Sequence, residues 1–341
     1  MNLIVIICLI ALVESRKLTT EENEKRLEVC GLTGKPKVFN GRPTKSSEAP
    51  WSVMVMTKKG DEEGGFCTGT ILSPRHILSA THCAATGDEN EWTHTDVKFP
   101  SPKEKCGEHD NLIVTEVAAS RVHVSSRNLT LLGRAKYLHM FQFCRVVNKG
   151  EYEVQYADDI MIIELADDIE YSENVQPACT ARDTIDNEIG TQLDFFGYGD
   201  NPPADMPKSP PRTRNEILLL HHKTYVSHMV KDGYQFSMDS RIFATKSVKM
   251  NTIACPGDSG GGAIRKIDGR NTVVGVAMRG SCEKMVRGRD GFEIHASVGY
   301  NHDNICESTG ICNPPRPDSS QFMSWMLVFI VVFIGVLWQE K

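Results

Sequence analysis

Short hydrophobic runs, each only as long as a β-strand, constrain the fold of this chain more than any other feature. From Phe66 onward these runs are separated by Gly, Pro and Asp. They are too short for helices and are typical of strands. Between two of them, Asp268-Gly269 favours the positive backbone angles of a tight hairpin. We therefore expect an all-β architecture of sandwich or barrel units. The clearest runs cover residues 66–72, 76–80, 160–165, 191–196 and 271–278.

The charge of the chain argues against nucleic acid as a partner. Its 341 residues carry 38 basic and 44 acidic side chains, which gives a net charge of −6. Such a chain does not attract phosphate backbones, and no basic stripe with interleaved aromatic residues compensates for this. With 40% hydrophobic residues, the composition is that of a globular protein, not of a disordered chain or a multi-span membrane protein.

The first residues predict export. Residues 3–13 are uninterrupted apolar residues, and the small residue Ser15 follows closely. We therefore predict a secretory signal over residues 1–15, with a core strand or short helix as the alternative. Downstream, Thr19 and Glu22 have the spacing of a capping box, which predicts a short solvated helix.

The last residues predict attachment to a membrane. Residues 322–338 carry no charge and just suffice to cross about 30 Å of hydrocarbon as a helix. Trp325 and Trp338 lie near its ends, where indole rings favour the membrane interface. A Pro-rich stalk over residues 314–321 precedes it. We favour a single-pass transmembrane segment, and the alternative is a lipid anchor attached near Asp318. Both place the protein at the cell surface or in a secretory-pathway membrane.

The cysteine count fits an exported, disulfide-bonded protein. Of 11 cysteines, Cys8 lies in the predicted leader, which leaves ten and therefore up to five disulfides. The sequence contains no Cys-x-x-Cys, and the segment from Cys106 to His109 lacks a second Cys-rich half. His221 and His222 are neighbours on a predicted strand, so they face opposite ways. We expect no metal site and no cofactor.

Three separated motifs carry the groups of a nucleophilic site. Ser259 lies among glycines, but a serine needs a base to take its proton and donors for the oxyanion that its attack creates. His82 ends one apolar run. Asp159 begins another, where a carboxylate is costly without a donor such as an imidazole N–H. Each residue alone has an ordinary structural explanation, and their joint occurrence in this order favours a catalytic triad.

From Cys30 to Val298 the chain resembles the trypsin-like serine proteases of the chymotrypsin fold. The matching motifs are Ser79-Ala-Thr-His82-Cys83, Asp159-Ile-Met-Ile and Gly257-Asp258-Ser259-Gly260-Gly261. The resemblance implies two six-stranded antiparallel β-barrels, with a boundary near residue 170 and the substrate between them. It also implies that residues 38–313 form the protease domain.

The same resemblance assigns a role to each residue of the triad. Ser259 is the nucleophile, His82 the general base and then acid, and Asp159 the group that orients the imidazole. The backbone amides of Gly257 and Ser259 form the oxyanion hole.

The resemblance also implies activation by a second protease. Cleavage after Lys37 ends a propeptide over residues 16–37 and frees the α-amino group of Val38. This ammonium turns inward and pairs with Asp258, whose charge is unfavourable next to a buried turn without a partner.

The resemblance further implies a set of disulfides. It pairs Cys67 with Cys83, Cys255 with Cys282 and Cys30 with Cys179. By elimination, Cys106 then pairs with Cys144 and Cys306 with Cys312. We also predict glycosylation at Asn128, in the sequon Asn-Leu-Thr.

The predicted substrate pocket departs from the family pattern. Trypsin has an acidic residue six positions before the serine, where this chain has Ile253, so specificity for basic residues is not expected. Ala277, Met278 and Arg279 replace the family's Ser-Trp-Gly, and Gly291 completes the predicted lining. Arg279 blocks the pocket, offers a cation to an acidic substrate residue, or turns to solvent.

These observations predict a membrane-anchored serine endopeptidase that hydrolyses polypeptide substrates. The first alternative is a pseudoprotease in which an intact triad faces an occluded pocket, so that the domain acts as a binding module. The second is an adhesion or structural protein on the same scaffold.

Overall fold

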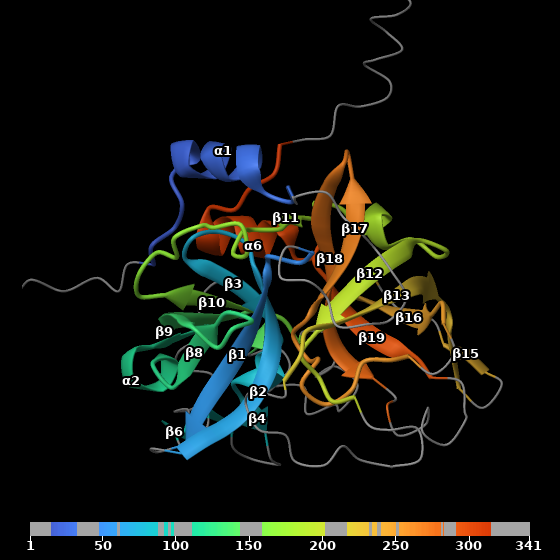
Figure 1. The fold of residues 1–341 in the computed structure, drawn as a ribbon, viewed down its shortest axis with the longest axis horizontal. Helices are drawn as coiled ribbons and strands as arrows, with labels where there is room; N and C mark the ends of the chain where they lie inside the picture. Colours follow the sequence, from blue (N-terminus) through green and yellow to red (C-terminus); the bar gives the residue numbers. More distant parts are fainter. Residues whose placement is uncertain are drawn as a thin grey trace, which may run out of the picture.

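The computed structural model shows a mostly β protein built from two barrels that lie side by side (Figure 1). The residues that it describes are 15–32, 48–59, 62–87, 92–94, 97–98, 111–143, 159–201, 217–231, 234–236, 240–249, 252–280, 282 and 291–314.

The first barrel is closed and antiparallel. Its strands follow the order β10-β3-β2-β1-β8-β9, and pairing between β9 and β10 closes the ring. A seventh strand, β7, pairs with β9 beyond the residues of β9 that pair with β8. The strands are β1 (Ser52–Lys59), β2 (Glu62–Ile71), β3 (His76–Ser79), β7 (Leu112–Thr115), β8 (Val122–Ser125), β9 (Leu131–Met140) and β10 (Met161–Leu165).

The second barrel repeats this plan. Its order is β18-β17-β12-β13-β16-β19, and β18 pairs with β19 to close it. The short strand β11 adds to β18 in the parallel sense. The strands are β11 (Cys179–Thr180), β12 (Gln192–Gly197), β13 (Leu220–Ser227), β16 (Ile242–Ser247), β17 (Gly262–Ile267), β18 (Arg270–Gly280) and β19 (Glu293–Ser297). Two closed six-stranded antiparallel barrels are the architecture expected from the sequence.

Smaller elements surround the barrels. One helix, α1, precedes the first barrel, and another, α6, follows the second. The remaining elements are β4 (Thr86–Gly87), β5 (Trp92–His94), β6 (Val97–Lys98), β14 (Met229–Lys231), β15 (Tyr234–Phe236), α1 (Thr20–Val29), α2 (Glu116–Ala119), α6 (His302–Thr309) and the 3-10 turns η1 (Thr81–Cys83) and η4 (Thr184–Asn187).

The hairpin expected at Asp268-Gly269 is confirmed. Asp268 has φ 50° and Gly269 has φ 79°, the two positive angles that a two-residue turn of this kind requires. Ile267 pairs with Arg270 directly across it, so β17 and β18 are joined by the shortest possible connection.

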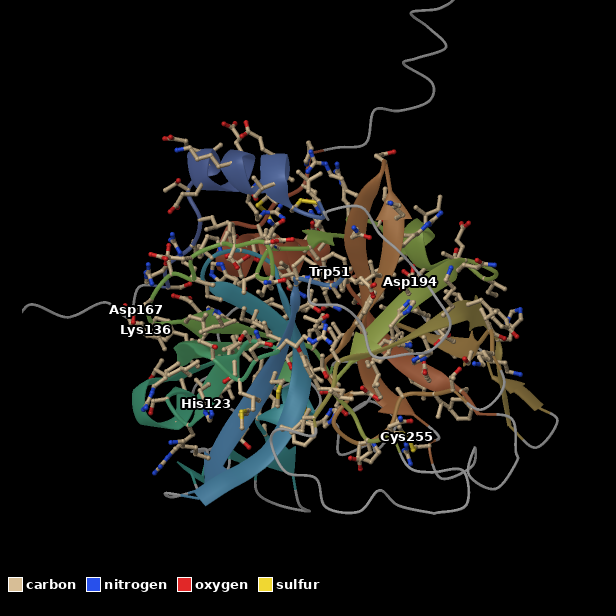
Figure 2. The ribbon with its side chains drawn as sticks, in the orientation of Figure 1. Trp51, His123, Lys136, Asp167, Asp194 and Cys255 are labelled. Atoms are coloured by element: carbon tan, nitrogen blue, oxygen red, sulfur yellow. A yellow bond between two sulfur atoms is a disulfide. The ribbon has the colours of Figure 1, made fainter. Side chains whose placement is uncertain are left out.

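Strand alternation divides the hydrophobic residues between two cores. On β10, Met161 and Ile163 point into the first barrel, whereas Ile162 joins a cluster that continues into the second. Trp51 lies at the junction of the barrels and contacts Phe196 edge to face, with 5.9 Å between ring centroids (Figure 2). The two barrels therefore share one continuous apolar cluster in addition to the interior of the first.

Helix α1 differs in one respect from the sequence prediction. Its capping box is present, because Thr19 Oγ1 accepts from the Glu22 N–H and Glu22 accepts from the Thr19 N–H. The helix is not solvated on all sides, however, since Asn23 and Arg26 are buried. Asn23 donates to the Cys312 carbonyl oxygen at 2.6 Å, which draws this face of α1 onto the residues after α6.

Disulfides connect distant parts of this architecture. They join Cys30 to Cys179, Cys67 to Cys83 and Cys255 to Cys282, the three pairs implied by the family resemblance, and Cys306 to Cys312, the pair expected by elimination. Cys106 and Cys144 lie outside the described residues.

Several sequence predictions concern residues that the structure does not describe. These are residues 1–14 of the leader, the junction Lys37-Val38, the stalk beyond residue 314 and the apolar segment 322–338. Within the described ranges, no helix is both long and apolar enough to cross a membrane.

Candidate active site

The register of two strands brings His82 and Asp159 together. β3 and β10 pair with Ser79 opposite Met161, so the turn after β3 lies beside the residues that enter β10. Asp159 Oδ2 lies 2.6 Å from His82 Nδ1, and Asp159 Oδ1 accepts from the His82 backbone N–H at 2.9 Å. This second bond fixes the carboxylate, so the imidazole ring has a defined orientation.

The Asp159 carboxylate also controls the charge of the imidazole. Burial disfavours a charged His82, but the charge and hydrogen bond of Asp159 outweigh burial and raise the pKa of His82 above its ordinary value. Asp159 is buried, while the His82 side chain is 42% exposed. The arrangement can therefore take up a proton at the open side of the ring and stabilise the resulting cation.

Glycines shape the loop that carries Ser259. Gly257 has φ 97° and Gly260 has φ 80°, both in the region that L side chains rarely adopt. A Cβ atom on Gly260 would collide with Ser79 Oγ and with the Thr68 carbonyl oxygen. At Gly260 the loop thus packs directly on the first barrel and leaves no space for a side chain.

Thr68 on β2 fastens this loop across the boundary between the barrels. Its backbone N–H donates to the Ser259 carbonyl oxygen at 2.8 Å, and its hydroxyl donates to the Gly257 carbonyl oxygen at 2.9 Å. The same hydroxyl accepts from the Tyr198 N–H at 3.0 Å. β2 pairs with β3, which leads into His82, so these bonds bring the serine loop to the same edge of the barrel.

Thr68 was missed by the sequence reasoning. A signal was available, since it follows Cys67, whose disulfide partner Cys83 directly follows His82. Only the structure shows that its hydroxyl bridges two segments 130 and 189 positions away.

Asp258 stabilises the serine loop by accepting hydrogen bonds from backbone N–H groups. Its Oδ1 accepts from the Gly199 N–H at 2.7 Å and its Oδ2 from the Cys255 N–H at 2.8 Å. Burial raises the pKa of the Asp258 carboxyl to about 6, against the opposing effect of these two hydrogen bonds. Val38, its expected partner after cleavage, lies outside the described residues.

The residues of the predicted pocket do not share one environment. Ala277 and Met278 are buried, Ile253 and Gly291 are partly buried, and Arg279 is exposed. Ala277 pairs with the serine loop, because its carbonyl oxygen accepts from the Gly260 N–H at 2.7 Å.

The two segments expected to line the pocket approach each other closely. A Cβ atom on Gly280 would collide with the Ala254 carbonyl oxygen. Residues near 254 and 280 therefore pack against each other, beside the disulfide that joins Cys255 to Cys282.

A buried acid–base network behind this region was not expected from the sequence. Glu293 Oε1 lies 2.7 Å from His222 Nε2 and accepts from the Ala254 N–H, while Thr245 donates to Oε2. Burial opposes charge on both partners, but their attraction prevails, lowering the pKa of Glu293 and raising that of His222. His221 instead bonds to Asp194 at 2.7 Å, so each of the adjacent histidines has its own carboxylate.

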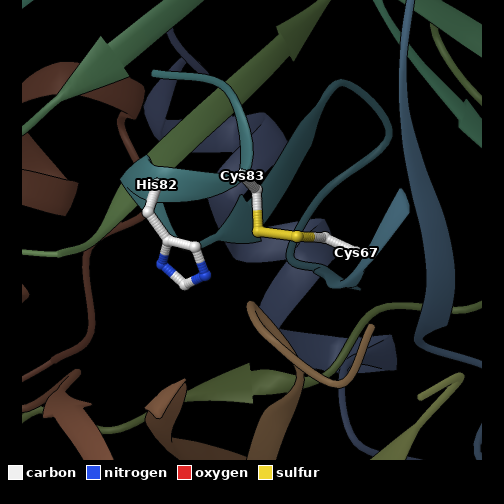
Figure 3. A group of neighbouring side chains, drawn as sticks. All are labelled: Cys67, His82 and Cys83. Atoms are coloured by element: carbon white, nitrogen blue, oxygen red, sulfur yellow. A yellow bond between two sulfur atoms is a disulfide. The ribbon is translucent and has the colours of Figure 1, made fainter. Parts of the chain in front are cut away.

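The group Cys67, His82 and Cys83 resembles a metal site only in its spacing. Its ligand atoms lie within 4.8 Å of one another. Figure 3 shows, however, that the two sulfur atoms are bonded to each other beside the imidazole. A disulfide offers no thiolate, so His82 is the single strong donor in this group.

Asn128, the predicted glycosylation site, is exposed.

Comparisons with known proteins identify the family of this chain. A family model described as the Nematode trypsin-6-like family matches residues 1–312. CLIP domain-containing serine protease B4 of Anopheles gambiae is 22% identical over 74% of this chain and 65% of its own. CLIP domain-containing serine protease HP8 of Bombyx mori is 22% identical over 70% of this chain and 59% of its own.

Two further comparisons concern a venom protein and a solved structure. Venom serine protease 34 of Apis mellifera is 28% identical over 68% of this chain and 49% of its own, so the chain spans about half to two thirds of these curated relatives. The scabies mite inactivated protease paralogue S-I1 superposes with a TM-score of 0.54 at 18% identity, over 79% of this chain and 98% of its own. This likeness concerns the fold alone.

Proposed function

Because the chain belongs to the Nematode trypsin-6-like family of trypsin-like serine proteases, we propose that it is an exported serine endopeptidase. In this proposal Ser259 attacks the peptide carbonyl, His82 accepts its proton and returns it to the leaving amine, and Asp159 stabilises the imidazolium. The amides of Gly257 and Ser259 hold the oxyanion.

The bond between His82 Nδ1 and Asp159 Oδ2 carries this proposal. At 2.6 Å, with a second bond from the His82 N–H, it holds the tautomer that leaves the other ring nitrogen free to accept a proton. The contacts of Thr68 with the serine loop support it, because they fasten that loop next to the same edge of the first barrel.

Activation in this proposal requires cleavage between Lys37 and Val38. In the uncleaved chain, Asp258 is buried and its two described partners are backbone N–H groups, which carry no full charge. An ammonium at Asp258 would supply that charge and order the oxyanion loop. In this proposal the apolar segment 322–338 holds the protein at a membrane, as a single span or as the signal for a lipid anchor.

A covalent probe tests the proposed activity. We expect the form cleaved after Lys37 to react with a fluorophosphonate at Ser259, and Ser259→Ala to abolish labelling. Peptide mapping by mass spectrometry identifies the modified residue. Uncleaved protein serves as the control and is expected to react at least about a hundredfold more slowly, since one missing oxyanion donor costs about 3 to 4 kcal/mol.

The runner-up function is a pseudoprotease that binds partners without cleaving them. Arg279, which stands where the family has Gly in the predicted pocket, favours it. A folded, correctly cleaved form that fails to label at Ser259 would decide for this alternative.

A further inference from the structure

The chain at the end of the predicted leader forms hydrogen bonds with a buried carboxylate of the first barrel. The Arg16 backbone N–H donates to Glu164 Oε1 at 2.7 Å, and Ser15 Oγ donates to Glu164 Oε2 at 2.8 Å. These partners lie 148 and 149 positions apart in the chain. The catalytic geometry makes no use of Glu164, which lies on β10 five residues after Asp159.

Glu164 is fully buried, which makes its charge costly without a positive partner. It shares a strand face with Ile162 and is 0% exposed. His139 Nε2, on a side chain that is 2% exposed, lies 3.0 Å from Oε2. Burial tends to raise the pKa of Glu164, but the hydrogen bonds from His139, Arg16 and Ser15 prevail and lower it. The carboxylate is therefore ionised at neutral pH, and an ammonium group beside it would add a full positive charge to these hydrogen bonds.

Contacts of its side chain and of the following residues hold Arg16 in a defined position. Its guanidinium donates to the Ala166 carbonyl oxygen at 2.7 Å and pairs with Asp168 at 2.6 Å. Two residues later, Leu18 is buried, and its N–H donates to the Thr309 carbonyl oxygen at 2.7 Å. Arg16 is thus held by its side chain, its backbone and the residues that follow it.

We propose that the leader is removed after Ser15 and that the freed α-amino group of Arg16 forms a buried ion pair with Glu164. Val13 and Ser15 precede this bond, and small residues of this kind precede cleavage by leader peptidases. The atom that such cleavage would convert to an ammonium is the one already 2.7 Å from the carboxylate.

The chemistry is a hydrolysis by a leader peptidase of the secretory pathway. Water breaks the Ser15–Arg16 peptide bond; its oxygen joins the Ser15 carbonyl carbon, and the Arg16 nitrogen gains hydrogen and then a proton from solvent. Ser15 leaves with its hydroxyl, and the ammonium offers three N–H groups in place of one. It can therefore serve both oxygens of Glu164.

This ion pair would fasten the N-terminal segment at its first residue. The other end is already fixed, because Cys30 is bonded to Cys179 and Arg270 donates to the Cys30 carbonyl oxygen at 2.9 Å. Between these points, α1 lies across one end of the molecule, next to α6 and β11 (Figure 1). The segment from Arg16 to Cys30 would then stay attached at both ends and connect the two barrels. This inference does not depend on protease activity.

The test begins with the N-terminus of the full chain, expressed in insect cells with its own leader and purified from their membranes in detergent. We expect sequencing to find Arg16 as the first residue. The native protein is then treated at pH 7.5 with 2-pyridinecarboxaldehyde, which reacts with free α-amino groups, and the adduct is followed by intact mass. An ion pair that raises the α-amino pKa by about one unit slows this reaction about tenfold.

Two variants and one control make the result specific. Glu164→Gln is expected to react about ten times faster than wild type, and the two should react equally after unfolding in guanidinium. Asp167→Asn removes an exposed charge from the turn after β10 and should behave as wild type. If Glu164→Gln does not fold, a form that begins at Ser15 displaces the ammonium by one residue and should react faster. A different first residue, or equal rates in all folded forms, would overturn the proposal.

Discussion

Thr68 contributes more to the proposed active site than a residue beside a disulfide would suggest. Its hydroxyl is shared between the Gly257 carbonyl oxygen and the Tyr198 N–H, and all three groups lie where the barrels meet. Removing the hydroxyl takes away the hydrogen bond that it donates to the Gly257 carbonyl oxygen, which costs about 1 to 3 kcal/mol. Because this carbonyl belongs to Gly257, the cost falls on the loop that is proposed to form the oxyanion hole. We regard Thr68 as a positioning residue.

The first prediction follows from this geometry. We expect Thr68→Val to lower kcat of the cleaved enzyme about tenfold or more, with a smaller change in KM, because the loop is displaced and not the substrate. Thr68→Ser keeps the hydroxyl and should retain most of the activity. Steady-state kinetics on a peptide substrate measures both. Equal activity of the Val and Ser variants would show that the hydroxyl does not position the loop.

At the scale of the element, the hairpin of β17 and β18 connects an exposed turn to the serine loop. β17 begins directly after the serine loop, and β18 returns to place Ala277 against that loop. The turn at Asp268-Gly269 sets the register of the pair from Ile267 opposite Arg270 to Ile264 opposite Val273, and a register shift follows between Ala263 and Ile264. A change at this exposed turn therefore acts first on the paired residues next to it.

The second prediction concerns that turn. Gly269 has φ 79° and open space around it, so Gly269→Ala meets no clash but adopts a strained backbone. We expect the free energy of unfolding to fall by about 1 to 2 kcal/mol. Denaturant titration measures this value, and Lys266→Ala on the same hairpin, also exposed, should change it by less than about 0.5 kcal/mol. A loss of equal size in both variants would contradict the role of the turn.

At the scale of the whole molecule, buried carboxylates link stability to pH in opposite directions. The raised pKa of Asp258, about 6, means that the folded, uncleaved chain favours the protonated acid. Its contribution to stability is present below the unfolded pKa near 4 and is lost as the pH rises through 6. Glu164 and Glu293 have lowered pKa values, so their contributions are present above the unfolded value near 4.3 and are lost at lower pH.

The third prediction uses this difference. When the pH rises from 5 to 7.5, we expect ionisation of Asp258 to decrease the unfolding free energy of the uncleaved protein by about 1 to 2 kcal/mol. Asp258→Asn should remove that part of the pH dependence and leave the part due to histidines. After cleavage at Lys37, pairing with Val38 should abolish the Asp258 contribution in the wild type as well. Denaturant titrations at both pH values provide the measurement, and identical slopes for wild type and Asp258→Asn would refute the assignment.

Local patterns in the sequence determined the fold class and most of the groups at the proposed site. Strand-length runs, the Asp268-Gly269 turn and the capping box at Thr19 depend on neighbours within a few positions, so they could be predicted directly. The order of His82, Asp159 and Ser259 could be recognised because each lies in its own compact motif.

Only the tertiary structure decided which distant polar groups meet. The pair of Glu293 with His222, the bridge made by Thr68 and the docking of Arg16 on Glu164 join residues 71, 189 and 148 positions apart. Strand periodicity predicts which face of a strand a side chain occupies, but not which residues pack against that face. Those residues depend on how each barrel closes and on where the segment with α1 crosses the barrels, and both are properties of the packed molecule.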